Sequence, residues 1–279
     1  MVEEYPRNLT ELEARFGTEE ACRAYLARLR WPDGFRCPRC GGERSWPVRA
    51  VLLECAGCGC QTSVTAGTIF QDTRTPLPIW FQAMWWVTTQ KNGASALGLQ
   101  RVLGLRKYET AWTMLHKLRR AMVRPGRDLL TGRIEVDESY VGSEEKGLPG
   151  RLNLKKALVV VATDGWLGYL PAERNGYQHE VTFLKGKKKT PSELMPRVHR
   201  VFSLLKRWLL GTHQGAVSQK HLDYYLDEFT FRFNRRRSRS RGKLFFRLAQ
   251  QAVAVDPVPY DHLVHPTPTK AKPQYVGVT

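Results

Sequence analysis

The sequence lacks the long hydrophobic segment that would place it in a membrane. No apolar run approaches the roughly eighteen residues that a bilayer-spanning helix needs. The first residues, MVEEYPRNLTELEARFG, are acidic and polar and are unlike a signal peptide. We therefore expect a cytoplasmic protein without a membrane partner.

Cysteine is scarce as well, with six in 279 residues. Because the cytoplasm keeps thiols reduced, we expect these cysteines to be metal ligands or free thiols rather than disulfides. Cys22 lies in a segment, residues 8–30, that is predicted to be helical with Thr18 as an N-cap. We interpret Cys22 as a small buried residue.

Acidic residues are few compared with basic ones. The chain has 26 Asp and Glu against 44 Lys and Arg, which gives a formal net charge of +18. An excess of this size is typical of proteins that bind a polyanion, most often nucleic acid. The alternative is a basic protein whose charge only keeps it in solution.

Four of the cysteines are spaced as in a zinc ribbon. Cys37 and Cys40 form one C-x2-C pair, and Cys55 and Cys58 form a second pair after fourteen intervening residues. Each such turn aims two thiolates at one tetrahedral ion, so the spacing predicts a structural zinc. Cys60 competes with Cys58 for the fourth position, and we favour Cys58 because it repeats the spacing of the first pair. Whether this ribbon contacts DNA or only stabilises the fold stays open.

A helix-turn-helix is predicted after the cysteines. A helix from Pro76 to about Lys91 precedes a short helix capped by Ser95, a turn at Gly104 and a longer helix over residues 107–122. The last helix and the turn before it carry six basic side chains: Arg106, Lys107, His116, Lys117, Arg119 and Arg120. We expect Lys117, Arg119 and Arg120 to contact DNA, although helical pairs with basic faces are common.

Two carboxylates accompany predicted strands in the second half of the chain. Asp137 lies within the β-rich segment 134–142, where burial of its charge is costly unless a positive group such as a metal ion meets it. Asp164 follows the apolar run 157–162, at the end of a predicted buried strand, where catalytic groups gather in α/β sheets. The alternatives are an edge strand with solvated acids and an Asp-Gly turn.

Basic residues follow these strands. A helix is predicted from Pro196 to Leu210, and its His199 and Lys206 are seven residues apart and share a face. They suit an ion ligand and a phosphate contact, and an ordinary surface pair would have the same spacing. A further helix over residues 219–234 leads into a run that we expect to contact the DNA backbone: Arg235, Arg236, Arg237, Arg239 and Arg241.

Several segments together resemble the ISXO2-like transposases of the IS1595 insertion-sequence family. They are CPRC and CAGC with QTSVTAGTIF, IWFQAMWW, IEVDESYVG, TDGWLGY, and the stretch from RVHRVFSLLKRW to DEFTFRFNRR. The resemblance implies a mixed α/β multidomain protein with an RNase H-like catalytic domain of the DDE type. It implies cleavage and joining of double-stranded DNA, namely element inverted repeats and target DNA, by a homo-oligomer associated with the nucleoid. We expect a helical lead-in (1–30), a zinc ribbon (31–75), a helix-turn-helix-like region (76–125), the transposase domain (130–252) and a disordered tail (253–279).

The resemblance also implies a catalytic site with two divalent ions, Mg²⁺ or Mn²⁺. Asp137 and Asp164 match the first and second acidic ligands. His199 occupies the third place, which is commonly Glu, and Lys206 matches a residue that holds the DNA backbone. Later residues, Glu228 or Asn234, are alternatives for the third ligand.

The interval between the two acidic ligands departs from this family pattern. An RNase H-like fold places two strands, a helix and a further strand in it, which takes about 45 residues, whereas Asp137 and Asp164 are 27 apart. If residues 159–161 pair with the strand at 134–141, we expect Asp164 to emerge away from Asp137. If they instead form the strand that delivers Asp164, a parallel crossover of about a dozen residues without a helix is needed, which is at the lower limit for such connections. We therefore predict that DNA binding survives and strand transfer is lost. The alternatives are a non-enzymatic regulator or transposition inhibitor, and an RNase H-like nuclease without strand transfer.

Overall fold

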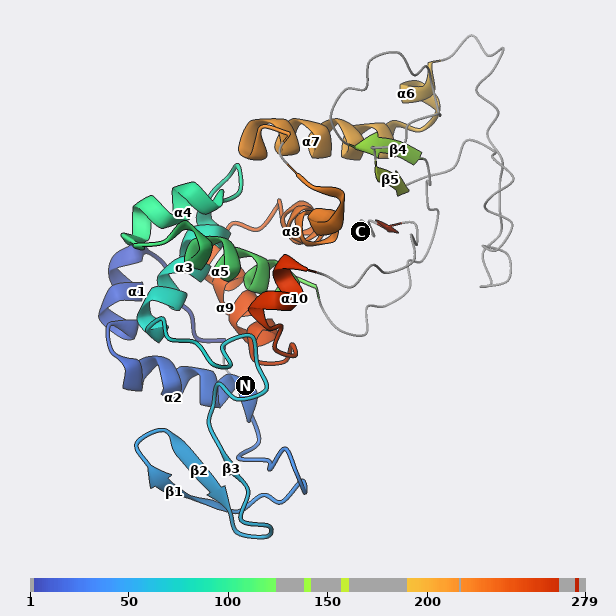
Figure 1. Cartoon of the computed structure of the whole chain (residues 1–279). Coiled ribbons are helices and arrows are strands. Elements are labelled where there is room, and N and C mark those ends of the chain that lie inside the picture. The colour runs from blue at the N-terminus through green and yellow to red at the C-terminus, as the bar shows by residue number, and fades with distance from the viewer. Residues whose placement is uncertain are drawn as a thin grey trace. The chain divides into compact units, whose positions relative to one another are not determined.

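The computed structural model describes residues 3–123, 138–141, 157–160, 190–215, 217–265 and 274–275. The chain divides into two compact units, one of residues 1–126 with 235–266 and one of residues 127–234 with 267–279 (Figure 1). Among the helices in the described ranges, none is both long and apolar enough to cross a membrane.

The first unit is mainly helical. It contains α1 (Leu9–Phe16), α2 (Glu19–Arg30), β1 (Ser45–Arg49), β2 (Leu52–Cys55), β3 (Gln61–Thr62), α3 (Leu77–Thr89), α4 (Ala96–Leu103), α5 (Tyr108–Ala121), α9 (Arg241–Ala252) and α10 (Tyr260–Val264). Its three strands form one antiparallel sheet in the order β1-β2-β3.

Side-chain caps set the starts of α1, α2, α4 and α9 in this unit, the last through Ser240, which accepts from the N–H of Lys243 at 3.2 Å. Asn8 accepts from the backbone N–H of Glu11 at 2.8 Å and begins α1. Thr18 accepts from the N–H of Ala21 at 3.2 Å and begins α2, so residues 8–30 form two helices and not one. Ser95 caps α4 as predicted, and the turn at Gly104 (φ +62°) leads to α5. The expected helix pair with a glycine turn is therefore present.

An aromatic cluster forms the core of the first unit and includes the C-terminal helix α9. Phe81 of α3 lies 4.7 Å from Phe16 of α1, 5.8 Å from Tyr25 of α2 and 5.7 Å from Phe245 of α9, measured between ring centroids. Because α9 is built into this core, the structure assigns residues 235–252 to the first unit, which corrects the predicted domain over 130–252.

The predicted disordered tail is also corrected at its start. Val255 is buried, and α10 follows with Leu263 fully buried. The polypeptide that leaves α9 thus remains packed on the first unit up to the end of α10. The rest of the predicted tail, apart from Gln274 and Tyr275, falls outside the described residues.

The second unit combines strands and helices. It contains β4 (Glu138–Val141), β5 (Ala157–Val160), α6 (Pro191–Leu194), α7 (Pro196–His213), the 3-10 helix η2 (Gln219–His221), α8 (Leu222–Asn234) and β6 (Gln274–Tyr275). The strand order is β4-β5-β6, with β4 antiparallel and β6 parallel to β5. One hydrophobic core joins β5, α7 and α8 through residues such as Val159, Phe202 and Phe229.

Helix α7 is longer than predicted. The predicted helix stops at Leu210, yet the helix continues through Gly211 to His213 and ends at Gln214, which has a left-handed backbone (φ +51°). A glycine within a helix costs only about 1 kcal/mol relative to alanine, so Gly211 alone does not stop a well-packed helix.

Candidate functional site

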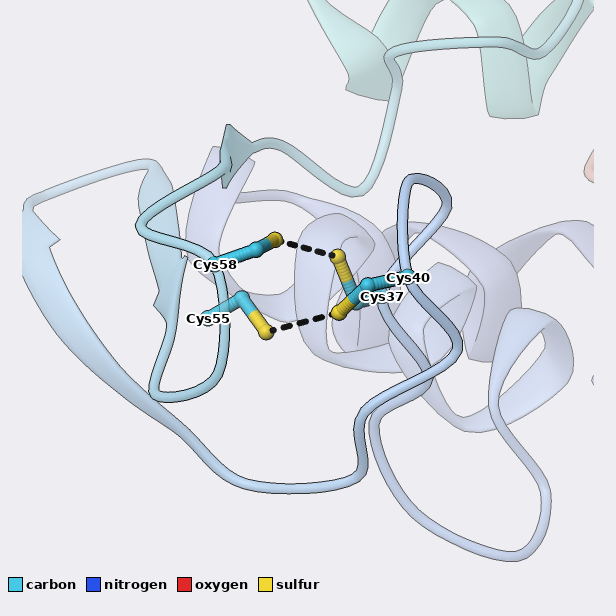
Figure 2. A group of neighbouring side chains, drawn as sticks. All are labelled: Cys37, Cys40, Cys55 and Cys58. Carbon is cyan, nitrogen blue, oxygen red and sulfur yellow. Dashed lines mark hydrogen bonds between the residues drawn. The ribbon is translucent and has the colours of Figure 1, made fainter.

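Four cysteine side chains converge at the base of the β1–β2 hairpin (Figure 2). The Sγ atoms of Cys37 and Cys58 are 3.6 Å apart, as are those of Cys40 and Cys55. All four Sγ atoms lie within 4.8 Å of one another. A disulfide brings its sulfur atoms to about 2.05 Å, so these distances describe four separate thiols around a common point.

The cluster fits a tetrahedral zinc ion. Zinc–sulfur bonds of about 2.3 Å at tetrahedral angles place the sulfur atoms about 3.8 Å apart, close to the 3.6 Å found here. Four thiolates leave no coordination position for water or substrate, which is the donor set of a structural site. The group includes Cys58, as predicted, whereas Cys60 Sγ faces the carbonyl oxygen of Gln61 at 3.9 Å.

Each pair of cysteines lies in the same kind of backbone turn. The N–H of Gly41 donates to the carbonyl of Cys37 at 2.9 Å, and the N–H of Gly59 donates to that of Cys55 at 3.0 Å. Both glycines have a left-handed backbone, with φ +74° and +65°. The repeated pattern is therefore C-x2-C-G. The glycine after each pair is a further sequence signal for the two turns, which the prediction from cysteine spacing did not include.

Backbone amides also contact the sulfur atoms and stabilise the thiolate form of Cys37. The N–H of Arg39 lies 3.4 Å from Cys37 Sγ, and that of Gly57 lies 3.4 Å from Cys55 Sγ. The backbone N–H of Cys40, and after it that of Arg39, lowers the pKa of the Cys37 thiol to about 6 against the opposing effect of burial. Because only the thiolate binds zinc, this shift favours metal binding at Cys37, whereas, against a hydrogen bond from the Gly42 N–H, the neighbouring thiols of Cys58 and Cys55 raise the pKa of Cys40 to about 12.

The basic residues of the helix-turn-helix differ widely in exposure. Arg106, Lys107 and Arg120 are exposed. Arg119 is 2% exposed, and its guanidinium donates to the carbonyl of Ala94 at 3.3 Å. A side chain with this placement serves the packing of α5 and cannot reach a phosphate, so the predicted DNA contact by Arg119 is corrected.

His116 and Lys117 are also placed differently from a simple basic face. His116 is fully buried, with its ring 4.1 Å from that of Trp112. Lys117 is half-buried and lines a cavity. The sequence correctly placed both residues on this helix. A list of its basic residues does not show which side of the helix faces the core.

Adjacent arginines on α5 allow a matched test of this assignment. Arg119→Met should lower the free energy of unfolding by about 1.5–3 kcal/mol, because it removes a buried, charged hydrogen-bond donor. Arg120→Met should leave the thermal midpoint unchanged within a few degrees and reduce the slope of log K against log salt for duplex DNA by about one unit. Calorimetry and a salt titration measure the two effects. A reversed pattern would contradict the assignment.

The arginine run after α8 lies in the first unit. Arg236, Arg237, Arg239 and Arg241 are exposed. Arg235 is half-buried, and burial, followed by the nearby charge of Arg247, lowers the pKa of its guanidinium. The four exposed arginines are therefore available to phosphates, and Arg235 is available only in part.

The predicted acidic ligands Asp137 and Asp164 lie outside the described residues. The structure does describe the two strands beside them. In the antiparallel β4–β5 pair, Glu138 is opposite Val160, so the residue after Asp137 faces the residue four positions before Asp164. Antiparallel pairing brings the start of β4 beside the end of β5, and the expectation that Asp164 emerges away from Asp137 concerns residues outside the described ranges.

The other predicted catalytic residues lie on α7. Lys206 is exposed, and His199 is half-buried in the first turn. The Nε2 atom of His199 is buried and has no hydrogen-bond partner in the part of the chain that the structure describes. Of the alternatives for the third ligand, Glu228 is fully buried and accepts from Arg232 Nε at 2.8 Å, while Asn234 is half-buried at the end of α8.

Comparisons with known proteins agree with this division of the chain. Residues 17–61 match the transposase zinc-ribbon domain family, and residues 156–234 match the ISXO2-like transposase domain. The second match contains Asp164, His199 and Lys206 and begins after Asp137. It ends at residue 234, where the second unit also ends before the chain returns to the first.

One relative comes from Halobacterium salinarum and is described as an uncharacterized protein in transposable element ISH50. It is 30% identical over 141 residues, which are 49% of this chain and 45% of that protein. The matched part of this chain thus spans about half the length of the relative. No solved structure matches the chain.

Proposed function

We propose that this chain, which carries the zinc-ribbon and ISXO2-like domains of the IS1595 transposases, binds insertion-sequence DNA through its first unit and does not complete strand transfer. The observation that carries the DNA-binding part is that the helix-turn-helix and the arginine run belong to one compact unit. Their exposed cations give that unit two basic segments far apart in the sequence. The proposed ligand is double-stranded DNA of the nucleoid, bound by a homo-oligomer.

Helix α5 is the proposed reading helix. In a helix-turn-helix, the N-terminal residues of the second helix contact base edges in the major groove. Arg106, Lys107 and Tyr108 are exposed at this end of α5. Arg120 and the arginine run are proposed to contact phosphates, which supply affinity without reading sequence.

The arginine run should account for a measurable share of the salt dependence. Replacing Arg236, Arg237, Arg239 and Arg241 with glutamine is expected to reduce the slope of log K against log salt by about one unit for each phosphate that is no longer neutralised. Replacing the exposed Arg7, Arg36 and Arg49 with glutamine is the control, which removes three positive charges where the test variant removes four. An unchanged slope in the first variant would show that the run is a solvated charge cluster.

Catalysis is proposed to be impaired by the short interval between the acidic residues. Strand β5 is already paired with β4 and ends at Val160, which leaves three residues before Asp164. Three residues are too few for the helix and further strands that normally precede the second acidic ligand. A carboxylate misplaced by about 1 Å can cost on the order of a hundredfold in rate.

The donor set at this site suits Mn²⁺ better than Mg²⁺. Asp137 and Asp164 would supply carboxylate oxygens, and His199 has a buried, unpaired ring nitrogen within the described chain. Imidazole binds Mg²⁺ less readily than oxygen ligands do. Two divalent ions, when bound, activate a water or 3′-hydroxyl and stabilise the leaving oxygen. Lys206 would hold the DNA backbone beside them.

Incubation of the protein with labelled element ends tests the proposal. We expect salt-sensitive retention of the duplex and no strand-transfer product with either Mg²⁺ or Mn²⁺. Asp137→Ala should leave retention unchanged. Strand transfer by the unmodified protein that disappears in Asp137→Ala would overturn the proposed loss of catalysis, and absence of any duplex binding would overturn the proposed function as a whole.

A non-enzymatic regulator or transposition inhibitor is the second candidate, favoured by the same short interval. Terminal inverted repeats around the gene would support a transposase copy. Their absence, together with tight binding to element ends elsewhere in the genome, would support the regulator.

A further inference from the structure

The first unit contains a cavity of about 520 Å³ that the proposed duplex contacts do not use. Three segments line it: the loop of residues 71–75, one face of α5, and residues 257–260 before and at the start of α10. Small-molecule sites in proteins have volumes of about 300–1,000 Å³, so this cavity is large enough for a single nucleotide.

The loop of residues 71–75 is a rigid wall of the cavity. The hydroxyl of Thr73 accepts from Trp80 Nε1 at 2.9 Å and from the N–H of Thr75 at 3.1 Å, and it donates to the carbonyl of Thr75 at 3.3 Å. Asp72 has a left-handed backbone with φ +56°, which is uncommon for a residue other than glycine. Strained positions of this kind cluster at ligand sites because the surrounding structure holds them in place.

The facing side of α5 offers hydrogen-bond donors. Thr110, Thr113 and Lys117 follow one another at spacings of three and four residues, so they lie on one stripe of the helix, and all three line the cavity. Burial lowers the pKa of the Lys117 ammonium, and the charge of Asp72 acts in the opposite direction. Within the described chain, Lys117 makes no salt bridge or hydrogen bond. A partly desolvated ammonium in the wall of a cavity is suited to meet an acceptor on a ligand.

The cavity also offers acceptors, which argues against a simple anion site. Asp72 and Glu109 balance the charges of Arg74 and Lys117 among its lining residues. Both carboxylates would repel the negative charges of a polyphosphate. A neutral group with donors on one part of its edge and acceptors on another would satisfy both kinds of side chain.

We propose that this cavity binds one unpaired nucleobase and prefers guanine. Guanine presents O6 and N7, which a lysine recognises, beside the N1–H and N2–H₂ donors that a carboxylate accepts. Met114 and the Pro257–Pro259 segment contribute apolar surface against which a base can lie. Because pairing in a duplex occupies the O6, N1 and N2 edge of guanine, the ligand is a nucleotide outside the double helix. Extrusion of a base costs a few kcal/mol, and least where the base is already unpaired.

This inference rests on the proposed function in one respect only, namely that DNA supplies the base. Titration calorimetry with the four free deoxynucleoside monophosphates tests the site itself. We expect dGMP to bind at least about tenfold more tightly than dAMP, dCMP or dTMP, a difference of about 1.4 kcal/mol. A duplex with one extrahelical guanine should likewise bind about tenfold more tightly than the same duplex fully paired. Preference for free dGMP without preference for the extrahelical guanine would assign the site to a free nucleotide and overturn the DNA source.

Two variants test the residues that carry the inference. Lys117→Met removes the ammonium and keeps a long side chain, while Asp72→Asn removes the charge with a residue that also tolerates a left-handed backbone. Each should weaken dGMP binding by about tenfold. Lys91→Met, which changes an exposed lysine that does not line the cavity, should leave it unchanged.

Equal affinity for all four nucleotides, or unchanged dGMP binding in both cavity variants, would overturn the inference. The measurements on the unmodified protein remain decisive even if one variant fails to fold. Loss of paired-duplex binding with dGMP binding retained would count against the proposed function and leave this site standing.

Discussion

Replacing Cys37 and Cys40 together with serine is expected to abolish zinc binding and unfold the ribbon. The unmodified chain should hold about one zinc ion, because four Sγ atoms lie within 4.8 Å of one another and match a closed structural site. The three-stranded sheet around them is small and has little apolar surface to bury, with Trp46, Val48 and Val51 all exposed. In small domains of this type, metal binding supplies most of the folding free energy, on the order of 10 kcal/mol. Elemental analysis and hydrogen exchange over residues 37–62 measure both effects.

Cys60→Ser is the matched control for this experiment. It removes a thiol from the same loop and should retain the full zinc content, since Cys60 Sγ faces the carbonyl of Gln61. Zinc should be released on acidification, because protonated thiols do not bind it. Full zinc retention in the double variant would show that the cysteine cluster is not the binding site.

The parts of the molecule that local chemistry determines could be predicted from the sequence. The two C-x2-C pairs predicted the ribbon, because the turn and the ligand geometry both depend on residues close in the chain. Thr18 and Ser95 predicted helix starts for the same reason, since an N-cap bonds to an amide three residues away. The helix-turn-helix elements followed from such local signals.

The remaining features depend on contacts between residues far apart in the sequence. Nothing near Phe245 indicates that its ring packs against Phe81, more than 160 residues earlier. The burial of Arg119 depends on the carbonyl of Ala94, which is 25 residues away. The strand register at Glu138 and Val160 decides which ends lie together, and hydrophobicity alone gives no direction of pairing.

The largest effect of a single methyl group is expected at Gly242 in α9. A Cβ atom there would lie 1.9 Å from the carbonyl oxygen of Pro6 and 2.7 Å from Tyr5 Cδ2. The nearest atom belongs to the backbone and cannot move aside as a flexible side chain can. Pro6 is also buried, and its segment is held to α9 by ion pairs from Glu3 to Lys243 and Arg247. The N-terminal segment and α9 therefore pack so closely at Gly242 that a Cβ atom has no room there.

Gly242→Ala should accordingly lower the free energy of unfolding by about 3 kcal/mol or more, at the upper end of overpacking effects, and the thermal midpoint by on the order of 10 °C. Gly211→Ala in α7 is the matched control: no atom lies within 4 Å of its added Cβ, and it should stabilise the helix by up to about 1 kcal/mol. A double-mutant cycle with deletion of residues 1–6 isolates the cause, because the deletion removes the three atoms nearest to the added methyl group, which belong to Tyr5 and Pro6. Gly242→Ala should be close to neutral in the shortened chain. An equal loss of stability with and without residues 1–6 would show that the crossing of the two termini is not what requires glycine at this position.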